Sequence, residues 1–377
     1  MKADVVIVGA GIVGLAHAWF AAQHGRRVTL FERDAQANGA TVRNFGMVWP
    51  IGQRVGTNYQ RAMRSRQHWL KLRDAAGVWV KECGSLHVAT EADEEQVLRE
   101  FVQLARPTGV EVQILSRAEL KERYPHTVAQ YTRGALYSPV ECCVEPRQAA
   151  RQLAEYLRNE HGMDFHWNTT VTQLDDGTLT TATGEHWSFN ESYICSGADQ
   201  QTLFPKEYAE SGLLTCKLQM MATAPQPDGW QLGPHIAGGL TLLHYAAFAG
   251  CPSLPKLRSR YEQTHASELK DGIHVMASQN ALGEIVIGDS HHYGSAISPF
   301  DSASINQRIL AYLQGLVTLP DESIARLWHG HYVKHPDTLQ YTAEVQANCF
   351  IIASPGGAGM TLSFALAEEW WQSRQSG

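Results

Sequence analysis

The sequence lacks any pair of cysteines at the C-x-x-C spacing that structural zinc sites and dithiol redox sites use. Its seven cysteines are scattered along 377 residues, and their number is odd. A small secreted protein held together by disulfides would show an even set at regular spacing. We therefore interpret the cysteines as reduced thiols, and we expect a cytoplasmic protein without a metal site.

An excess of positive charge is also missing. The chain has 31 Lys and Arg residues against 38 Asp and Glu residues, which gives a formal net charge of -7. Such a surface does not attract phosphate backbones or anionic lipids, so nucleic acid is not expected as a partner. The sequence contains neither an internal repeat nor a low-complexity segment, and it says nothing about oligomeric state.

Long apolar runs without glycine are absent too. Residues 5–22 and 350–367 are each about as long as a membrane span, but both contain several glycines. The first run also resembles a signal peptide, yet Asp4 lies where a basic segment is required and the glycines fall at motif spacing. We expect neither a membrane span nor secretion.

The length and the changing pattern along the chain predict two domains. From Gly84 the pattern changes to short alternating strands and charged helices, and the style of a nucleotide-binding domain returns after Pro146. The periodicity predicts helices over residues 58–76, 146–161, 254–270 and 302–316.

A glycine motif follows the first predicted strand. Gly9-Ala10-Gly11-Ile12-Val13-Gly14 has the form G-x-G-x-x-G, with a β-branched run before it and a helical pattern after it. Glu32 ends the next strand, where a carboxylate can accept hydrogen bonds from a ribose. Together these features predict a dinucleotide site at the start of a helix. The alternative is a tight strand-to-helix turn without a ligand.

A second glycine turn lies near the other end of the chain. Residues 354–361, from Ser354 to Thr361, contain three glycines between a predicted strand and the last helix. Backbone N–H groups in such a turn can face an electron-rich ring edge. Because G-x-G-x-x-G serves NAD and FAD alike, this second turn is what favours FAD. An ordinary loop cap would look the same.

These motifs resemble the family of glycine oxidase, D-amino-acid oxidase and sarcosine oxidase, over nearly the whole length. The matching pieces are the N-terminal motif, residues 39–46, 145–147, 195–198 and 288–289, and the closing residues 356–361. The resemblance implies an α/β fold, with a discontinuous Rossmann-like FAD-binding domain and a mixed-sheet α+β substrate domain. It places the first over residues 1–82, 140–212 and 325–377, and the second over residues 83–139 and 213–324.

The resemblance also implies the chemistry: hydride transfer to flavin N5 from the carbon beside a small amine, with the electrons passed on to oxygen. Sarcosine oxidases tether the flavin through a cysteine where this chain has Gly330, so we expect non-covalent FAD. The cofactor contacts implied by the resemblance are Gly9, Gly11, Gly14, Glu32, Arg33, Arg43, Asn44, Gly46, Val171, Gly197, Gly356, Gly357, Gly359, Met360 and Thr361.

The chain departs from the family pattern where the substrate should bind. Tyr332 stands where the amino-acid oxidases place an arginine that forks onto the substrate carboxylate, so an α-amino acid is not the obvious substrate. With Tyr332, the catalytic candidates are His331, Lys334 and Arg43, which would suit an anionic substrate. A solvated polar strand end would look the same. Further candidates to line the pocket are His291, His292 and Tyr293.

Three segments, residues 43–53, 334–338 and 359–364, are similar to a bacterial subgroup associated with phosphonate breakdown. That resemblance implies 2-aminoethylphosphonate or its N-methyl derivative as substrate, with an aldehyde and hydrogen peroxide as products. Three alternatives stay open: a flavin-dependent dehydrogenase of a D-amino acid or hydroxy acid that uses another acceptor than oxygen, an NAD-dependent dehydrogenase, and a flavin-binding subunit that depends on a partner protein.

Overall fold

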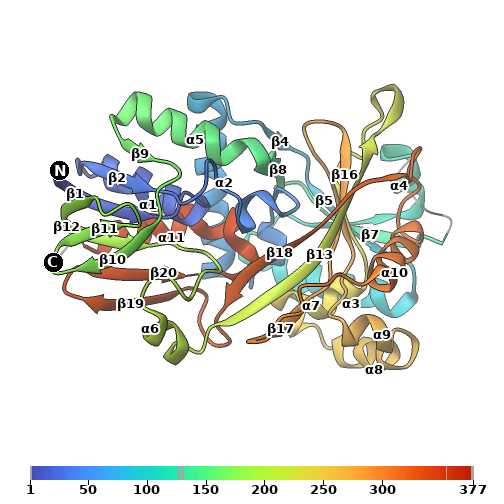
Figure 1. The fold of residues 1–377 in the computed structure, drawn as a ribbon. Helices are drawn as coiled ribbons and strands as arrows, with labels where there is room; N and C mark the ends of the chain where they lie inside the picture. Colours follow the sequence, from blue (N-terminus) through green and yellow to red (C-terminus); the bar gives the residue numbers. More distant parts are fainter. Residues whose placement is uncertain (1, 126–128, 130, 354, 375–377) are drawn as a thin grey trace.

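The computed structural model describes residues 2–125, 129, 131–353 and 355–374. Two lobes lie side by side, and each is built around its own sheet (Figure 1). Both chain termini lie in the same lobe, which we call the first lobe. The other is called the second lobe. Within the described ranges, no helix has both the length and the apolar character needed to cross a bilayer.

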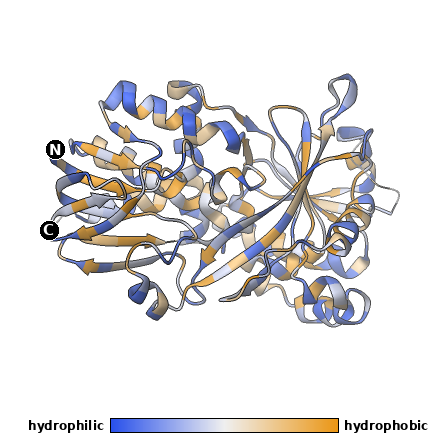
Figure 2. Cartoon of the chain, in the orientation of Figure 1, coloured by the Kyte–Doolittle hydropathy of each residue, from blue (hydrophilic) through white to orange (hydrophobic). Residues whose placement is uncertain are grey.

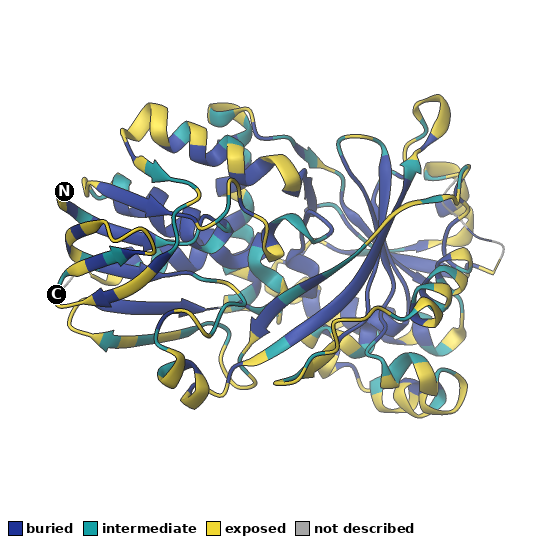
Figure 3. Ribbon diagram, viewed as in Figure 1, coloured by how far each residue is buried: buried dark blue, intermediate teal, exposed yellow. Residues whose placement is uncertain are grey.

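The first lobe contains an eight-stranded sheet with the path β10-β11-β12-β1-β2-β9, to which β20 and β19 are added beside β12. Its strands are β1 (Lys2–Val8), β2 (Val28–Phe31), β9 (Asp164–His166), β10 (Val171–Asp175), β11 (Thr178–Thr181), β12 (His186–Ile194), β19 (Tyr341–Gln346) and β20 (Cys349–Ala353). The central strands run parallel, and β10, β11 and β19 are antiparallel to their neighbours. Side chains on one face of this sheet pack against helices, and those on the other face pack mainly against the β10-β11 hairpin and neighbouring loops. The strands β2 and β20 are entirely buried, and β1 is mostly buried, as Figure 3 shows.

Four helices pack in the first lobe: α1 (Ile12–Gln23), α2 (Thr57–Ala76), α5 (Pro146–His161) and α11 (Gly359–Ser373). α1 is apolar on nearly every side because it lies between the sheet and other helices (Figure 2). Trp69 on α2 meets Phe364 on α11 edge to face at 4.9 Å between ring centroids, and its indole N–H donates to the Met360 carbonyl oxygen at 2.7 Å. These contacts fix the start of α11.

The second lobe contains a nine-stranded mixed sheet with the path β17-β13-β16-β15-β14-β5-β7-β6, and β18 joins β13. Its strands are β5 (Ser85–Ala89), β6 (Gln113–Ser116), β7 (Gly134–Ser138), β13 (Leu214–Pro225), β14 (His235–Ala237), β15 (Met276–Gln279), β16 (Glu284–Gly288), β17 (His292–Gly294) and β18 (Ile324–Lys334). β14 and β5 are parallel, whereas the other pairs are antiparallel. Its helices are α3 (Ala92–Ala105), α4 (Arg117–Arg123), α7 (Leu240–His244), α8 (Leu254–Thr264), α9 (Ala266–Lys270) and α10 (Ala303–Gln314).

Smaller elements complete the fold. A three-stranded sheet is formed by β3 (Met47–Val48), β8 (Cys142–Val144) and β4 (Val80–Glu82). The other short helices are α6 (Pro205–Glu210), η1 (Ala40–Val42), η2 (Pro50–Gly52), η3 (Arg106–Thr108), η4 (Pro227–Gly229), η5 (Ala246–Gly250) and η6 (Gly356–Ala358). The β3-β8-β4 sheet lies between the lobes in Figure 1.

The predicted elements agree with the structure except at one helix. The helix expected over residues 254–270 is divided into α8 and α9 at His265, whose backbone has φ −136° and ψ 36°. Thr264 and His265 both have low helix propensity, and the Thr264 hydroxyl lies 2.8 Å from the His265 ring nitrogen. The residue boundaries of the two domains stay a prediction.

Phe364 lies at the centre of the α1, α2 and α11 contact and is completely buried, whereas Phe300 is 82% exposed. We expect Phe364→Ala to lower the free energy of unfolding by about 3–5 kcal/mol, because it removes apolar surface and leaves a cavity. Phe300→Ala is the matched control and should change little. Urea unfolding of both variants measures the difference, and equal losses would contradict this account of the core.

Candidate active site

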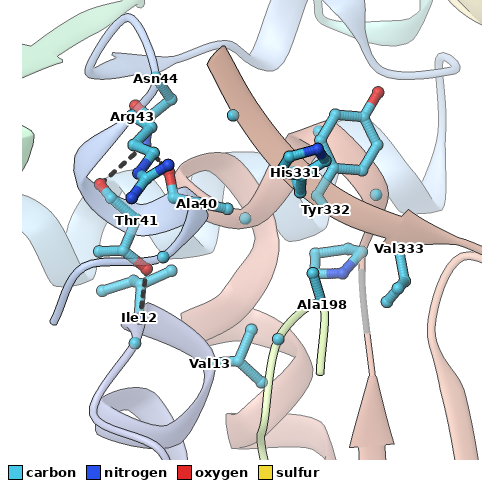
Figure 4. Close-up of a pocket in the computed structure, with 18 of the residues that line it drawn as sticks. Ile12, Val13, Ala40, Thr41, Arg43, Asn44, Ala198, His331, Tyr332 and Val333 are labelled. Carbon is cyan, nitrogen blue, oxygen red and sulfur yellow. Dashed lines mark hydrogen bonds between the residues drawn. The ribbon is translucent and has the colours of Figure 1, made fainter. Parts of the chain in front are cut away.

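A cavity of about 450 Å³ is lined by residues of both lobes. It runs from the glycine motif after β1, past the loop that contains η1, to the end of β18 in the second lobe. In Figure 4, Arg43 and Asn44 lie on one side of the cavity, and His331 and Tyr332 lie on the other. A cavity of this size between two lobes is typical of a cofactor or substrate site.

The glycine motif forms the floor of one end. Gly9 has φ +107°, and a Cβ added there would collide with the Cys195 carbonyl oxygen. A Cβ on Gly14 would collide with the Gly9 carbonyl oxygen, so Gly14 lets α1 pack against the turn. Gly11 precedes α1 without a side-chain cap, and the Ile12 N–H donates to the Thr41 hydroxyl at 2.9 Å (Figure 4). The Ile12 N–H is thus used by Thr41, and the N–H groups that follow it in the first turn of α1 are the donors that can face a pyrophosphate.

Glu32 is fixed beside this turn. Its carboxylate accepts hydrogen bonds from the Ala10 N–H at 2.8 Å and the Asp34 N–H at 3.1 Å, and its side chain is buried. Carboxylate oxygens have further lone pairs, so Glu32 can also accept from a ribose. Arg33 lines the cavity too, and it forms an ion pair with Asp199 at 2.7 Å.

The other predicted cofactor contacts divide into two groups. The predicted contacts that line the cavity are Gly9, Gly11, Glu32, Arg33, Arg43, Asn44, Val171, Gly197, Gly356, Gly357, Gly359, Met360 and Thr361. Gly14 and Gly46 are not among the lining residues. Gly46 has φ +73°, and a Cβ there would collide with the Val144 carbonyl oxygen, so the two glycines permit close packing of backbone behind the cavity.

The second glycine turn faces the end of β18. A Cβ built on Gly357 would lie 3.5 Å from the Tyr332 hydroxyl oxygen. The Thr361 hydroxyl accepts a hydrogen bond from the Trp49 N–H at 2.9 Å, so it anchors the start of α11 as well as lining the cavity. Ser354, the first residue of the predicted turn, lies outside the described residues.

The loop after η1 is held by Asn44. Its amide donates to the Ala40 and Thr41 carbonyl oxygens at 3.0 and 2.8 Å, and its side-chain oxygen accepts from the Gly46 N–H at 2.7 Å. Asn44 therefore shapes the loop. Arg43 donates to the His329 carbonyl oxygen on β18 at 3.2 Å, so the loop contacts that strand directly.

Tyr332 lines the cavity at the end of β18. It is buried, and its hydroxyl oxygen lies 3.3 Å from that of Tyr293. Burial raises the pKa of Tyr332 well above its ordinary value, and Cys216 and Tyr293 act in the same direction. The hydroxyl therefore stays neutral at physiological pH. Lys334 also lines the cavity, with its ammonium 5.7 Å from the centre of the Tyr293 ring.

His331 lies beside His329, with 5.1 Å between ring centroids, and it lines the cavity. Burial lowers the pKa of His331, and the nearby His329, Lys217 and Arg43 lower it further. The imidazole is therefore neutral at physiological pH and can accept a proton.

The three further candidates to line the pocket, His291, His292 and Tyr293, meet different outcomes. His291 and Tyr293 line the cavity, whereas His292 is exposed and lies 3.1 Å from the Asp271 carboxylate. His244 and His274, which were not among the residues predicted from the sequence, also line the cavity and contact His291. No local signal could have found them, because the three histidines come from segments far apart in the chain.

Comparison with known proteins supplies the family. A family model described as FAD dependent oxidoreductase matches residues 4–370. The chain belongs to this family. The predicted FAD cofactor is thereby confirmed, and the NAD-dependent alternative is excluded. The residues that fit FAD are the first glycine turn, the Glu32 carboxylate and the second glycine turn. Gly330, which stands where sarcosine oxidases carry the cysteine that tethers the flavin, lies against Arg43.

Individual relatives are distant. The chain is 26% identical over 206 residues to glycine oxidase of Geobacillus kaustophilus, a match that covers 52% of this chain and 54% of that protein. It is 24% identical over 247 residues to L-2-hydroxyglutarate dehydrogenase of Escherichia coli, covering 62% and 56% of the two chains. The chain thus spans about half the length of the curated relatives it matches.

The fold is similar to that of the glycine oxidase from Bacillus cereus. The TM-score is 0.79 at 18% identity, over 100% of this chain and 95% of the other. This likeness confirms the predicted fold class, a Rossmann-like FAD-binding part with a mixed-sheet substrate part.

We expect Gly9→Ala to abolish FAD retention, because the added Cβ would collide with the Cys195 carbonyl oxygen and block the tight turn. Gly25→Ala is the matched control: Gly25 also has a positive φ, +72°, but a Cβ there meets no atom within 4 Å. The measurement is the ratio of flavin to protein absorbance after purification. A Gly9→Ala protein that keeps a full complement of flavin would contradict this role of the turn.

Proposed function

We propose that the protein is an FAD-dependent oxidase of a small primary or secondary amine that carries a phosphonate, namely 2-aminoethylphosphonate or its N-methyl derivative. The products are an aldehyde and hydrogen peroxide. The likeness to glycine oxidases supports an amine substrate. The free thiols of all seven cysteines support a cytoplasmic location.

The observation that carries the proposal is the charge at the substrate end of the cavity. Among the described residues that line the cavity, the Lys and Arg side chains are Arg33, Arg43 and Lys334. Arg33 is paired with Asp199 at the nucleotide end, and Arg43 bonds to the backbone of β18. A planar fork for a carboxylate is therefore missing beside Tyr332, whereas a point charge at Lys334 suits a tetrahedral anion.

Bound FAD supplies the acceptor for the hydride that leaves the carbon beside the amine. The chain's own residues position the substrate. Tyr332 stays a neutral hydroxyl and can hold the amine by a hydrogen bond, and His331 stays a neutral imidazole that can take the proton from a substrate ammonium. Lys334 holds the anionic end of the substrate by charge.

A second function has one specific observation in its favour. The match to L-2-hydroxyglutarate dehydrogenase of Escherichia coli covers 62% of the chain, against 52% for the glycine oxidase of Geobacillus kaustophilus. A flavin-dependent dehydrogenase of a D-amino acid or hydroxy acid, with an acceptor other than oxygen, is therefore the alternative proposal.

Purified holoprotein should release hydrogen peroxide with N-methyl-2-aminoethylphosphonate or 2-aminoethylphosphonate, and not with glycine, sarcosine or D-alanine. A coupled peroxidase assay with these five compounds side by side measures this. Peroxide from glycine or D-alanine alone would refute the phosphonate proposal. Bleaching of the flavin without peroxide would favour the dehydrogenase.

Lys334→Gln should raise KM for the aminophosphonate by about ten- to a hundredfold with kcat little changed, because a charge-assisted contact to the substrate is lost in ground state and transition state alike. Lys256→Gln, an exposed lysine on α8 away from the cavity, is the control. Steady-state kinetics with both variants provide the comparison. An unchanged KM in Lys334→Gln would remove this residue from substrate binding.

A further inference from the structure

Beyond Tyr332 the cavity reaches a cluster of three imidazoles. His244 ends α7, His274 precedes β15, and His291 lies in the loop between β16 and β17. Their ring centroids are 3.8 Å apart for His244 and His274, 4.7 Å for His274 and His291, and 4.8 Å for His244 and His291. All three line the cavity, together with the neighbouring Asp289 and Tyr245.

Polar atoms in this cluster are buried without partners. Both ring nitrogens of His274 and one carboxyl oxygen of Asp289 have no hydrogen-bond partner among the described residues. The His274 Nε2 and Asp289 Oδ1 atoms lie 3.3 Å apart, but they are not aligned for a hydrogen bond. Unsatisfied buried polar groups are rare because each is costly, so this group of atoms indicates a ligand site.

We propose that His244, His274 and His291 form a subsite for a tetrahedral dianion, which gains protons on the imidazoles as the dianion binds. The ligand class is a phosphonate or phosphate group. The subsite deepens the proposed function, because in that function it would take the phosphonate head group while the amine lies at Tyr332. It needs no further reactant, since the protons come from solvent.

The Lys334 ammonium near the cluster favours an anion over a metal cation. Burial lowers the pKa of His274 well below its ordinary value and that of His291 to about 4. Desolvation by the cavity walls also lowers the pKa of His244, although part of this residue is exposed, so all three rings are neutral when the cavity is empty. Burial raises the pKa of Asp289, which leaves its carboxyl protonated and able to donate. The Lys334 ammonium lowers the pKa of His244 and His291 further, because it repels a second positive charge nearby.

A bound dianion favours protonation of the three imidazoles, because an adjacent negative charge raises the pKa of an imidazole. The remaining polar groups at the cluster are hydroxyls of Tyr245 and Tyr293 and the exposed His292, which faces Asp271 instead. The Nδ1–H of His291 donates to the Gly272 carbonyl oxygen at 3.1 Å, so its Nε2 is the atom left to gain a proton. Protonated imidazoles and the Asp289 carboxyl together supply several donors to one tetrahedral group.

The cluster also lies at a suitable place for one end of a short substrate. The His291 ring is 6.1 Å from the Tyr293 ring and 6.4 Å from the Tyr332 ring, between centroids. Tyr332 in turn faces Gly357 in the second glycine turn. The cluster is therefore one layer of side chains beyond the turn, on the second-lobe side of the cavity.

The test is binding of methylphosphonate, which has no amine to oxidise, to the oxidised holoprotein. Flavin absorbance changes report the affinity, and calorimetry in two buffers of different ionisation enthalpy reports proton uptake. We expect uptake of protons at a pH where methylphosphonate is already a dianion, and weaker binding as the pH rises. Methanesulfonate, a monoanion of the same shape, should bind at least about tenfold more weakly.

His274→Asn and His291→Asn should each weaken methylphosphonate binding by about tenfold or more and reduce the proton uptake. His186→Asn, an exposed histidine on β12 that does not line the cavity, is the control and should leave both unchanged. Flavin content and thermal unfolding establish that each variant is folded. Where one does not fold, the wild-type proton uptake and the preference over methanesulfonate still decide the question.

The outcomes separate this subsite from the proposed function. Oxidation of an aminophosphonate with unchanged KM in both His variants would overturn the subsite and leave the function standing. Histidine-dependent binding of methylphosphonate by a protein that oxidises no aminophosphonate would support the subsite and refute the function. Binding that requires added Zn²⁺ and is lost with a chelator would overturn the proposal in favour of a metal site. Binding without proton uptake would overturn it as well.

Discussion

Strand β18 is paired with β13 from Leu214↔Lys334 to Thr223↔Ile324, and the second-lobe end of the cavity depends on this pairing. It extends a strand of the second sheet toward the first lobe, where its last residues meet the second glycine turn. A shift of register by one residue would turn the side chain of Tyr332 to the opposite face of the sheet. The loop around Arg43 also contacts β18, so the flavin side and the substrate side are aligned by one strand.

Burial, more than pairing of charges, sets the protonation of the cavity. Desolvation is the largest cause of the raised pKa of Tyr332 and Asp289 and of the lowered pKa of the histidines. Neutral groups in a low-dielectric site suit hydride transfer, because an amine must lose its ammonium proton before it reacts. The same neutrality makes an anionic substrate costly to desolvate unless the site can gain positive charge on binding.

The cofactor end of the site was predictable because its signals are local. Gly9, Gly11 and Gly14 lie within six residues, at the spacing that a dinucleotide-binding turn between a strand and a helix uses. Glu32 follows at the end of the next strand, and the second turn lies at the start of the last helix. In each case the turn and the backbone or side-chain group that contacts the cofactor lie in the same short segment of the sequence.

The substrate end was only partly predictable because its residues come from separate segments. Tyr332 and Lys334 were found through a departure from a family pattern, but His244 and His274 had no such reference. His244 and His274 come into contact only because α7 and β15 pack together in the second lobe. No spacing of residues along the sequence indicates that packing. Asn44 was expected to contact the cofactor, and the structure adds that its amide is engaged by its own loop.

The two proposals together explain why an arginine would be the wrong residue at position 332. An arginine is permanently charged, so it attracts carboxylates and phosphonates at every pH and holds a planar anion best. A neutral tyrosine there leaves the anionic end of the substrate to a more distant group of donors. Imidazoles that charge only when a dianion arrives favour phosphonate over carboxylate, because a monoanion raises their pKa less. Selectivity then comes from the charge of the ligand and its shape together, with the amine held between that group and the flavin turn.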